Sequence, residues 1–315
     1  MSIVLLTGST GFVGQAILRA LVLNGESVIC PDRKRPRSDR EFVSGIDGDT
    51  DWFGLLAGVS CVIHSAARVH VVNETVADPL SEFRKVNVEG TLKLATQAAA
   101  LGVKRFIFLS SIKVNGETTS AGSPFTSADA PAPLDAYGIS KWEAEQGLNA
   151  LARETDMDVV IIRPVLVYGP GVKANFLGMM NWLNKGFPLP LGALDNRRSL
   201  VGLDNLVDLI VLCVDHPAAA NQVFLVSDDE DISTTELLER MAHALGKPAR
   251  LLPVPSWVLQ AGASLVGKRE VARRLCESLQ VDIGKTKSLL DWRPPVALDA
   301  ALRITAKDFL ERRRK

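Results

Sequence analysis

Tyr137 and Lys141 are the residues of this chain whose spacing first suggests acid–base chemistry. The chain has two tyrosines, and Tyr137 is followed four residues later by a lysine. Four residues make about one turn of an α-helix, so both side chains would lie on one helix face. A neighbouring ammonium group is expected to lower the tyrosine pKa from its ordinary value of about 10. Such a tyrosine can take a proton from an alcohol or give one to a carbonyl oxygen.

A tyrosine–lysine pair is also common on exposed helices, so its context decides between the two interpretations. Here an apolar run at residues 106–109 leads directly into Ser110 and Ser111. If that run is a parallel strand, Ser111 lies at the edge of the sheet where such folds bind their ligands. Its hydroxyl could then hydrogen-bond the reacting oxygen. Ser111, Tyr137 and Lys141 are therefore the candidate catalytic residues.

A glycine-rich turn near the start of the chain predicts a dinucleotide site. The glycines stand between an apolar run and a helix-like segment, where they allow positive φ angles and close approach of a pyrophosphate to the helix N-terminus. An ordinary strand-to-helix turn is the alternative. The candidate cofactor residues of the turn are Gly8, Thr10, Gly11, Phe12, Val13 and Gly14.

The second strand ends at two residues that favour different cofactors. Asp32 lies where an acidic side chain would bind the ribose hydroxyls of NAD. Arg33 follows at once and opens a basic run that could hold the 2′-phosphate of NADP, although the run could equally be a solvated loop. We therefore expect NAD(P)(H), with NADP(H) slightly favoured. Asp49 could accept a hydrogen bond from the adenine amino group, or could cap a short helix.

Alternating strand and helix patterns predict an α/β fold with a doubly wound parallel sheet. Continuous apolar runs, which suit strands buried on both faces, occupy residues 3–6, 28–30, 61–64, 106–109 and 159–162. Helical spacing covers residues 13–23, 80–101 and 142–153. We expect a cofactor-binding domain over residues 1–170. A smaller, mostly helical substrate-binding region should follow over 171–315, with helices at 204–214, 235–245, 270–279 and 298–310. This boundary is soft, because later segments can return to the first domain.

Composition argues against several other classes of protein. The 36 basic and 36 acidic side chains balance to a formal charge of zero, which does not favour a nucleic-acid-binding protein. The four widely spaced cysteines suggest neither a metal site nor a disulfide framework. No apolar run is long enough for a membrane span, and the first residues do not resemble a signal peptide. We expect a cytoplasmic protein.

Taken together, these motifs resemble the extended short-chain dehydrogenase/reductases, the NAD-dependent epimerase/dehydratase family. The resemblance covers nearly the whole chain and rests on residues 7–14, 62–67, 87–91, 109–116, 137–141 and 163–170. It implies a Rossmann-type cofactor domain and a homodimer formed through the helices at 80–101 and 142–153. It also implies that Lys141 holds the nicotinamide ribose beside Tyr137. Further cofactor contacts would come from Ser65, Ala66, Ala67, Asn87 and Pro164.

The resemblance also implies a nucleotide-sugar substrate linked to UDP. Arg198 matches the arginine that grips the diphosphate, and Arg274 is a weaker second anchor that could instead be a surface residue. Asn175 and Ser111 are further candidate substrate contacts. Lys113 either touches the sugar or faces solvent.

The residues after Ser111 narrow the reaction. Dehydratases of this family place an acidic pair where this chain has Ile112 and Lys113, so dehydration is disfavoured. Residues 110–117 most resemble bacterial reductases of surface-polysaccharide pathways. Our first expectation is reduction of a UDP-4-keto-6-deoxy-hexosamine at C4, and the alternative is a UDP-hexose 4-epimerase. A dinucleotide-sensing protein without catalysis and a small-carbonyl reductase are further alternatives.

Overall fold

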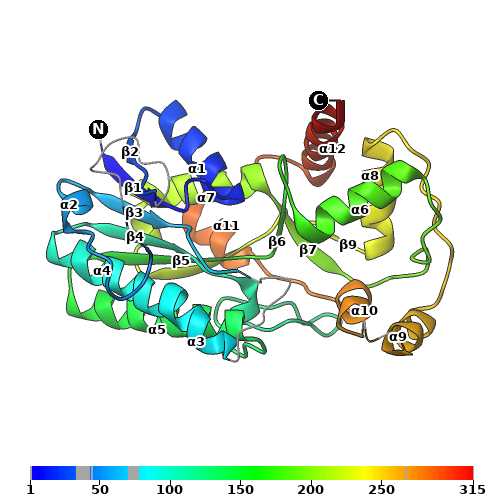
Figure 1. Ribbon diagram of the computed structural model, residues 1–315, viewed down its shortest axis with the longest axis horizontal. Coiled ribbons are helices and arrows are strands. Elements are labelled where there is room, and N and C mark those ends of the chain that lie inside the picture. Colours follow the sequence, from blue (N-terminus) through cyan, green and yellow to red (C-terminus); the bar gives the residue numbers. More distant parts are fainter. Residues whose placement is uncertain are drawn as a thin grey trace.

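A six-stranded parallel sheet forms the N-terminal part of the molecule (Figure 1). The computed structural model describes residues 2–32, 43, 45–69, 78–265, 267 and 269–314. The strand order is β2-β1-β3-β4-β5-β8, and every pairing in this sheet is parallel. The strands are β1 (Ile3–Thr7), β2 (Ser27–Ile29), β3 (Cys61–His64), β4 (Arg105–Leu109), β5 (Asp158–Pro164) and β8 (Gln222–Val226).

Successive residues of β1, β3, β4 and β5 enter two different cores, because side chains alternate across a strand. In β3, Val62 packs with one cluster and Ile63 with the other. The first core includes α1 (Phe12–Leu23) and α7 (Leu203–Asp215), and the second includes α4 (Thr91–Ala100) and α5 (Ala136–Glu154). Figure 1 shows these helix pairs on opposite faces of the sheet. The expected doubly wound architecture is confirmed. Five of its six strands lie within two residues of the predicted bounds, and β8 was not predicted.

Several helices differ from expectation. The helix predicted at 270–279 ends at Cys276, and Leu279 instead forms a β-bridge with Arg198. The predicted helix at 80–101 is a continuous run of α3 (Pro79–Arg84), a π-helical turn η2 (Lys85–Gly90) and α4. The predicted helix at 142–153 begins earlier, at Ala136, because the Asp135 carboxylate accepts a hydrogen bond from the Gly138 amide and caps the helix there. As a result, Tyr137 and Lys141 both lie within the first two turns of α5.

The C-terminal part surrounds a small three-stranded sheet of order β6-β7-β9. Its strands are β6 (Leu166–Tyr168), β7 (Arg198–Gly202) and β9 (Asp231–Ile232). Its helices are α6 (Ala174–Lys185), α8 (Thr234–Ala244), α9 (Ser256–Leu265), α10 (Arg269–Cys276) and α12 (Leu298–Arg314), while α2 (Phe53–Leu56) and α11 (Gly284–Leu290) lie by the main sheet. The region is helical as predicted, but α7 and β8 pack with the main sheet. No helix of the described residues has the length and apolar character to cross a membrane.

Candidate active site

The glycine turn between β1 and α1 is too tightly packed for larger residues. Gly8 has a φ of +73°, and a Cβ atom there would lie 2.8 Å from the Ala66 amide nitrogen. A Cβ atom on Gly14 would lie 2.0 Å from the Gly8 carbonyl oxygen. The Gly11 amide closes the turn by donating to that same oxygen at 2.9 Å. Glycine is therefore required at position 8 by space and by backbone angle, and at position 14 by space.

This turn fits the pyrophosphate of a dinucleotide. Gly11 is the N-cap of α1 and offers no side-chain cap, and the first turn of the helix holds no acidic residue. Thr10 and Gly11 are exposed, whereas Phe12 and Val13 are partly buried against the core. The unpaired amides and the positive end of the helix dipole are thus open to an anion. The residues present suit the phosphates of NAD or NADP.

Other predicted cofactor residues gather around the same sheet edge. Ser65 donates to the Thr7 carbonyl oxygen at 2.6 Å, which fixes the segment containing Ala66 and Ala67 beside the turn. Asp32 is partly buried just after β2, whereas Asp49 is exposed in a turn before α2. Pro164 is buried at the end of β5, and Arg33 lies outside the described residues.

Asn87 fastens the segment after β3 to the catalytic helix. Its side-chain oxygen accepts from the Arg68 amide at 2.8 Å, and its side-chain nitrogen donates to the Ser140 hydroxyl at 3.0 Å. The π-helical turn of η2 places this buried side chain between the two segments. Asn87 is therefore a positioning residue in this structure, and its contact with the cofactor stays a prediction.

The structure brings the three candidate catalytic residues together. Ser111 follows β4, and its hydroxyl accepts from the Lys113 amide at 3.2 Å. The Ser111 hydroxyl is also hydrogen-bonded to that of Tyr137. The ammonium group of Lys141 donates to the Leu109 carbonyl oxygen at 2.9 Å and lies 6.0 Å from the centre of the Tyr137 ring. A serine–tyrosine hydrogen bond at a sheet edge is suited to proton transfer at one oxygen of a ligand.

The charge states of this trio differ from the simple expectation. Burial raises the pKa of Tyr137 above its ordinary value and the Asp135 carboxylate raises it further, while the hydrogen bond from Ser111 opposes both. Burial lowers the pKa of Lys141 to about 7, opposed by Glu145. The prediction that Lys141 depresses the tyrosine pKa is thus wrong for this structure. The ammonium group is directed to the Leu109 carbonyl and to the face of Phe108, 4.4 Å away.

A buried ion pair behind the site was not predicted from the sequence. Glu145 is fully buried and binds Arg163 through two hydrogen bonds of 3.0 and 2.5 Å. The same carboxylate accepts from the Ser110 hydroxyl at 2.5 Å, and Arg163 also donates to Asn115 at 2.9 Å. One signal was available: Glu145 lies four residues after Lys141 and therefore shares its helix face. This pair fixes the backbone on both sides of Ser111.

His64 was also missed. Its ring nitrogens lie 2.8 Å from the Thr7 hydroxyl and 3.0 Å from the Thr91 hydroxyl, and its ring stacks on Phe108. Burial lowers the pKa of His64 to about 3, assisted by the positive charge of Lys141. The histidine is therefore neutral at physiological pH and links β1 to α4, so it does not act as an acid.

Two predicted substrate anchors are neighbours in the C-terminal part. Arg198 begins β7 and donates to the carbonyl oxygens of Arg274 and Glu277 at 2.9 and 3.0 Å. Burial lowers the pKa of Arg198, and the positive charge of Arg274 on α10 lowers it further. The Glu277 carboxylate opposes both effects. Two like charges that repel each other favour an anion close to both. Asn175 is exposed in the first turn of α6, and Lys113 pairs with the carboxylates of Glu117 and Asp135.

Comparison with known proteins identifies the family of the chain. Residues 4–227 match the model of the NAD dependent epimerase/dehydratase family. The chain belongs to this family. It is 50% identical over 313 residues to a UDP-glucose 4-epimerase of Vibrio cholerae, covering 98% of this chain and 95% of the relative. The sequence-based resemblance is thereby confirmed.

Solved structures of family members have the same fold. UDP-glucuronic acid 4-epimerase from Bacillus cereus in complex with NAD aligns with a TM-score of 0.77 at 20% identity, over 98% of this chain and 96% of that one. UDP-glucose 4-epimerase from Thermotoga maritima, with UDP-glucose, aligns with a TM-score of 0.74 at 23% identity, over 98% and 99% of the two chains. The chain therefore shares the fold of these proteins, and its family and its 50% identical relative identify it as an enzyme.

Proposed function

We propose that this enzyme is an NAD-dependent UDP-hexose 4-epimerase. The observation that carries the proposal is the 50% identity to a UDP-glucose 4-epimerase along nearly the whole of both chains. The hydrogen-bonded Ser111 and Tyr137 beside the dinucleotide turn supply groups suited to chemistry at one hydroxyl-bearing carbon. This ranks the epimerase above the reductase that the residues after Ser111 first favoured.

The residues of the chain have distinct roles in this proposal. When bound, the nicotinamide supplies reversible hydride transfer at C4. Ser111 hydrogen-bonds the C4 oxygen, and Tyr137 takes the hydroxyl proton from that oxygen and later gives it back. Lys141 holds the ribose beside Tyr137. Because its pKa is about 7, this lysine changes its protonation state near neutral pH. Tyr137 would thus serve the C4 oxygen in both directions, and inversion at C4 would require the hydride to return to the opposite face of that carbon.

Arg198 and Arg274 bind the diphosphate of the substrate in this proposal. Their proximity creates a local positive charge in a chain whose net charge is zero. Guanidinium groups suit phosphate oxygens because they donate two parallel hydrogen bonds. Asn175 is proposed as a weaker contact, since it is exposed on α6.

For the cofactor, we propose NAD rather than the slight preference for NADP(H) expected from the sequence. That preference depended on Arg33, whereas Asp32 is placed just after β2 as a ribose-binding acid would be. NADP(H) would fit the second candidate function, a UDP-4-keto-6-deoxy-hexosamine reductase. The raised pKa of Tyr137 favours that candidate, because a protonated phenol is ready to donate to a ketone.

One experiment separates the two functions. The purified protein is denatured to identify the released dinucleotide, and fresh protein is incubated with UDP-glucose and UDP-GlcNAc. We expect bound NAD and formation of the C4 epimer without net change in cofactor absorbance. Failure to epimerise either sugar, together with oxidation of added NAD(P)H by the 4-keto sugar, would replace the proposal with the reductase.

We also propose a homodimer formed through α3–α4 and α5, and light scattering would show twice the chain mass of 34.0 kDa.

A further inference from the structure

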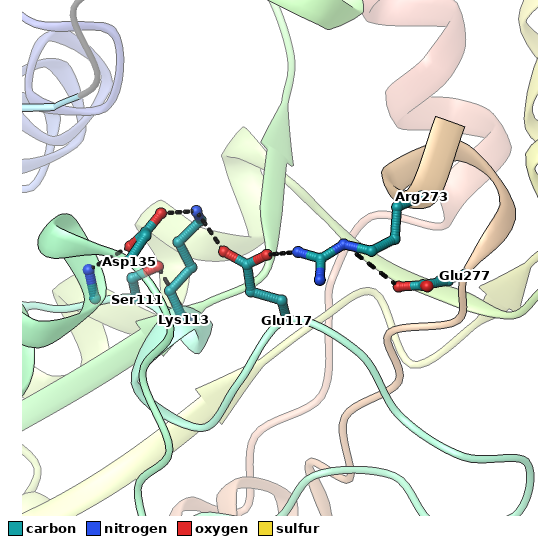
Figure 2. A network of polar contacts seen from close by, with 7 residues as sticks. Ser111, Lys113, Glu117, Asp135, Arg273 and Glu277 are labelled. Atoms are coloured by element: carbon teal, nitrogen blue, oxygen red, sulfur yellow. Dashed lines mark hydrogen bonds and ion pairs between the residues drawn. The ribbon is translucent and has the colours of Figure 1, made fainter. Parts of the chain in front are cut away.

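A row of alternating charges crosses from the catalytic helix to the C-terminal part of the molecule (Figure 2). The ammonium group of Lys113 pairs with the carboxylates of both Asp135 and Glu117. Glu117 in turn binds the guanidinium of Arg273 at 2.5 Å. We call Asp135, Lys113, Glu117 and Arg273 the relay. Its members run negative, positive, negative, positive, so each inner residue is held from both sides.

The first end of the relay fixes both reacting hydroxyls. Asp135 uses one carboxylate oxygen for Lys113 and the other for the Gly138 amide at 2.7 Å, so it caps the helix that carries Tyr137. The backbone amide of Lys113 donates to the Ser111 hydroxyl at 3.2 Å. One residue, Lys113, therefore holds the catalytic serine through its backbone and the tyrosine helix through its side chain.

The other end of the relay fixes the anion site. Arg273 lies on α10 next to Arg274, whose carbonyl oxygen accepts a hydrogen bond from Arg198. The Arg273 guanidinium also lies 3.8 Å from the Glu277 carboxylate. The carbonyl oxygen of Glu277 accepts a hydrogen bond from Arg198. The position of α10 relative to β7 thus depends on residues bound to the relay.

The relay is shielded enough for its charges to matter. The side chains of Lys113, Asp135 and Glu117 are only 23%, 22% and 11% exposed, and that of Arg273 is 32% exposed. Ion pairs on an open surface contribute little, whereas partly buried pairs are less screened and lose more when one partner is removed. Backbone hydrogen bonds join the same regions, such as the Thr119 amide to the Ser278 carbonyl oxygen at 2.9 Å. Those bonds hold the segment after Glu117 to the segment after α10. The side chains of the relay add a contact with the start of the catalytic helix.

We propose that the relay couples the anion site on α10 to the catalytic serine and tyrosine, so that diphosphate binding and proton transfer are positioned together. The functional half of this inference rests on the proposed roles of Arg198, Arg274 and Tyr137. It assigns Lys113 as a positioning residue whose side chain binds two carboxylates of the protein, in place of the sugar contact considered from the sequence.

Coupling through the relay is reciprocal, which gives a test that needs no substrate. Lys113 reaches α10 only by way of Glu117 within the relay, and Arg273 reaches α5 by the same route. Hydrogen exchange is measured by mass spectrometry on the protein as purified, for Lys113→Met and Arg273→Met. We expect Lys113→Met to raise exchange in residues 269–276, and Arg273→Met to raise it in residues 136–141. If exchange in residues 269–276 is unchanged in Lys113→Met and exchange in residues 136–141 is unchanged in Arg273→Met, the coupling is refuted.

The control and a gentler variant keep this test interpretable. Lys287→Met removes an ion pair to Asp229 of 2.7 Å, with side chains 33% and 43% exposed, and should leave both segments unchanged. Glu117→Gln preserves side-chain shape while removing the central charge, so it replaces either methionine variant that fails to fold. It should raise exchange in both segments, and unchanged exchange in both would count against the relay.

A double-mutant cycle measures the functional half. The affinity for UDP alone and the kcat and KM for the active sugar are measured for Lys113→Met, Arg273→Met and the double variant. If the relay acts as one unit, the loss in the double variant falls short of the product of the single losses by about threefold or more. Multiplicative losses would overturn the coupling even if epimerisation is confirmed. Conversely, absence of epimerisation would refute the proposed function and leave the exchange result standing.

Discussion

Replacing Lys141 with methionine should change stability in a way that depends strongly on pH. The lysine is 1% exposed, and its pKa of about 7 compares with about 10.4 for a lysine in an unfolded chain. Between these two values the unfolded chain binds more protons than the folded one, so stability rises with pH across this window. The folded state therefore carries a penalty for the buried charge that is greatest below pH 7.

The size of the effect follows from the difference between the two pKa values. At about 1.4 kcal/mol per pKa unit, the penalty approaches about 5 kcal/mol below pH 7 and falls to about 2 kcal/mol at pH 9. Methionine has a similar length and no charge, so its packing effects are the same at both pH values. The change in unfolding free energy caused by Lys141→Met should thus be more favourable at pH 6 than at pH 9 by about 3 kcal/mol.

Urea unfolding of nucleotide-free protein, followed by the fluorescence of the five tryptophans, measures this difference. Lys307→Met is the matched control, because that lysine side chain is 77% exposed and its loss should have nearly the same effect at both pH values. An equal change at pH 6 and pH 9 for Lys141→Met, or a larger gain at pH 9, would refute the argument from burial.

Three further substitutions test separate parts of the site. Tyr137→Phe should lower kcat by about a hundredfold or more while UDP affinity, measured by calorimetry, stays near that of the wild type, because only proton transfer is lost; wild-type turnover would remove Tyr137 from the chemistry. Arg274→Ala should raise KM by about tenfold with little change in kcat, since it removes one charged hydrogen bond to the diphosphate; steady-state kinetics showing a pure loss of kcat would contradict this. Glu145→Gln should lower the unfolding free energy by about 3 kcal/mol by leaving Arg163 buried without its charged partner; an unchanged urea midpoint would show that the pair contributes little.

The main sheet was predictable because its strands are buried on both faces and therefore apolar throughout. The run that contains Val62 and Ile63 illustrates this, since one side chain enters each core. The strands β6, β7, β8 and β9 were not predicted. They pair with partners distant in sequence, and β6 and β9 are only three and two residues long. The start of α5 was placed too late because its first turn contains a glycine, a weak helix former, and its cap, Asp135, is recognised only through the hydrogen bond to Gly138.

The candidate site was predictable where a local motif carries the chemistry. The spacing of Tyr137 and Lys141 predicted a shared helix face, and the structure places both beside Ser111. The direction of the tyrosine pKa was not predictable, because it depends on burial and on a carboxylate whose position only the fold reveals. The pair of Glu145 and Arg163 was not predicted for the same reason, because the two residues lie 18 positions apart on different elements, α5 and β5.

Epimerisation of a UDP-hexose carrying deuterium at C4 tests the central proposal most directly. A hydride removed from C4 and returned to the same carbon keeps the label, whereas removal of a proton would exchange it with water. Proton NMR of the products in ordinary water should show both C4 epimers with deuterium retained at C4. Epimers that have lost the label to solvent, or no epimer from either UDP-glucose or UDP-GlcNAc, would contradict the proposed function.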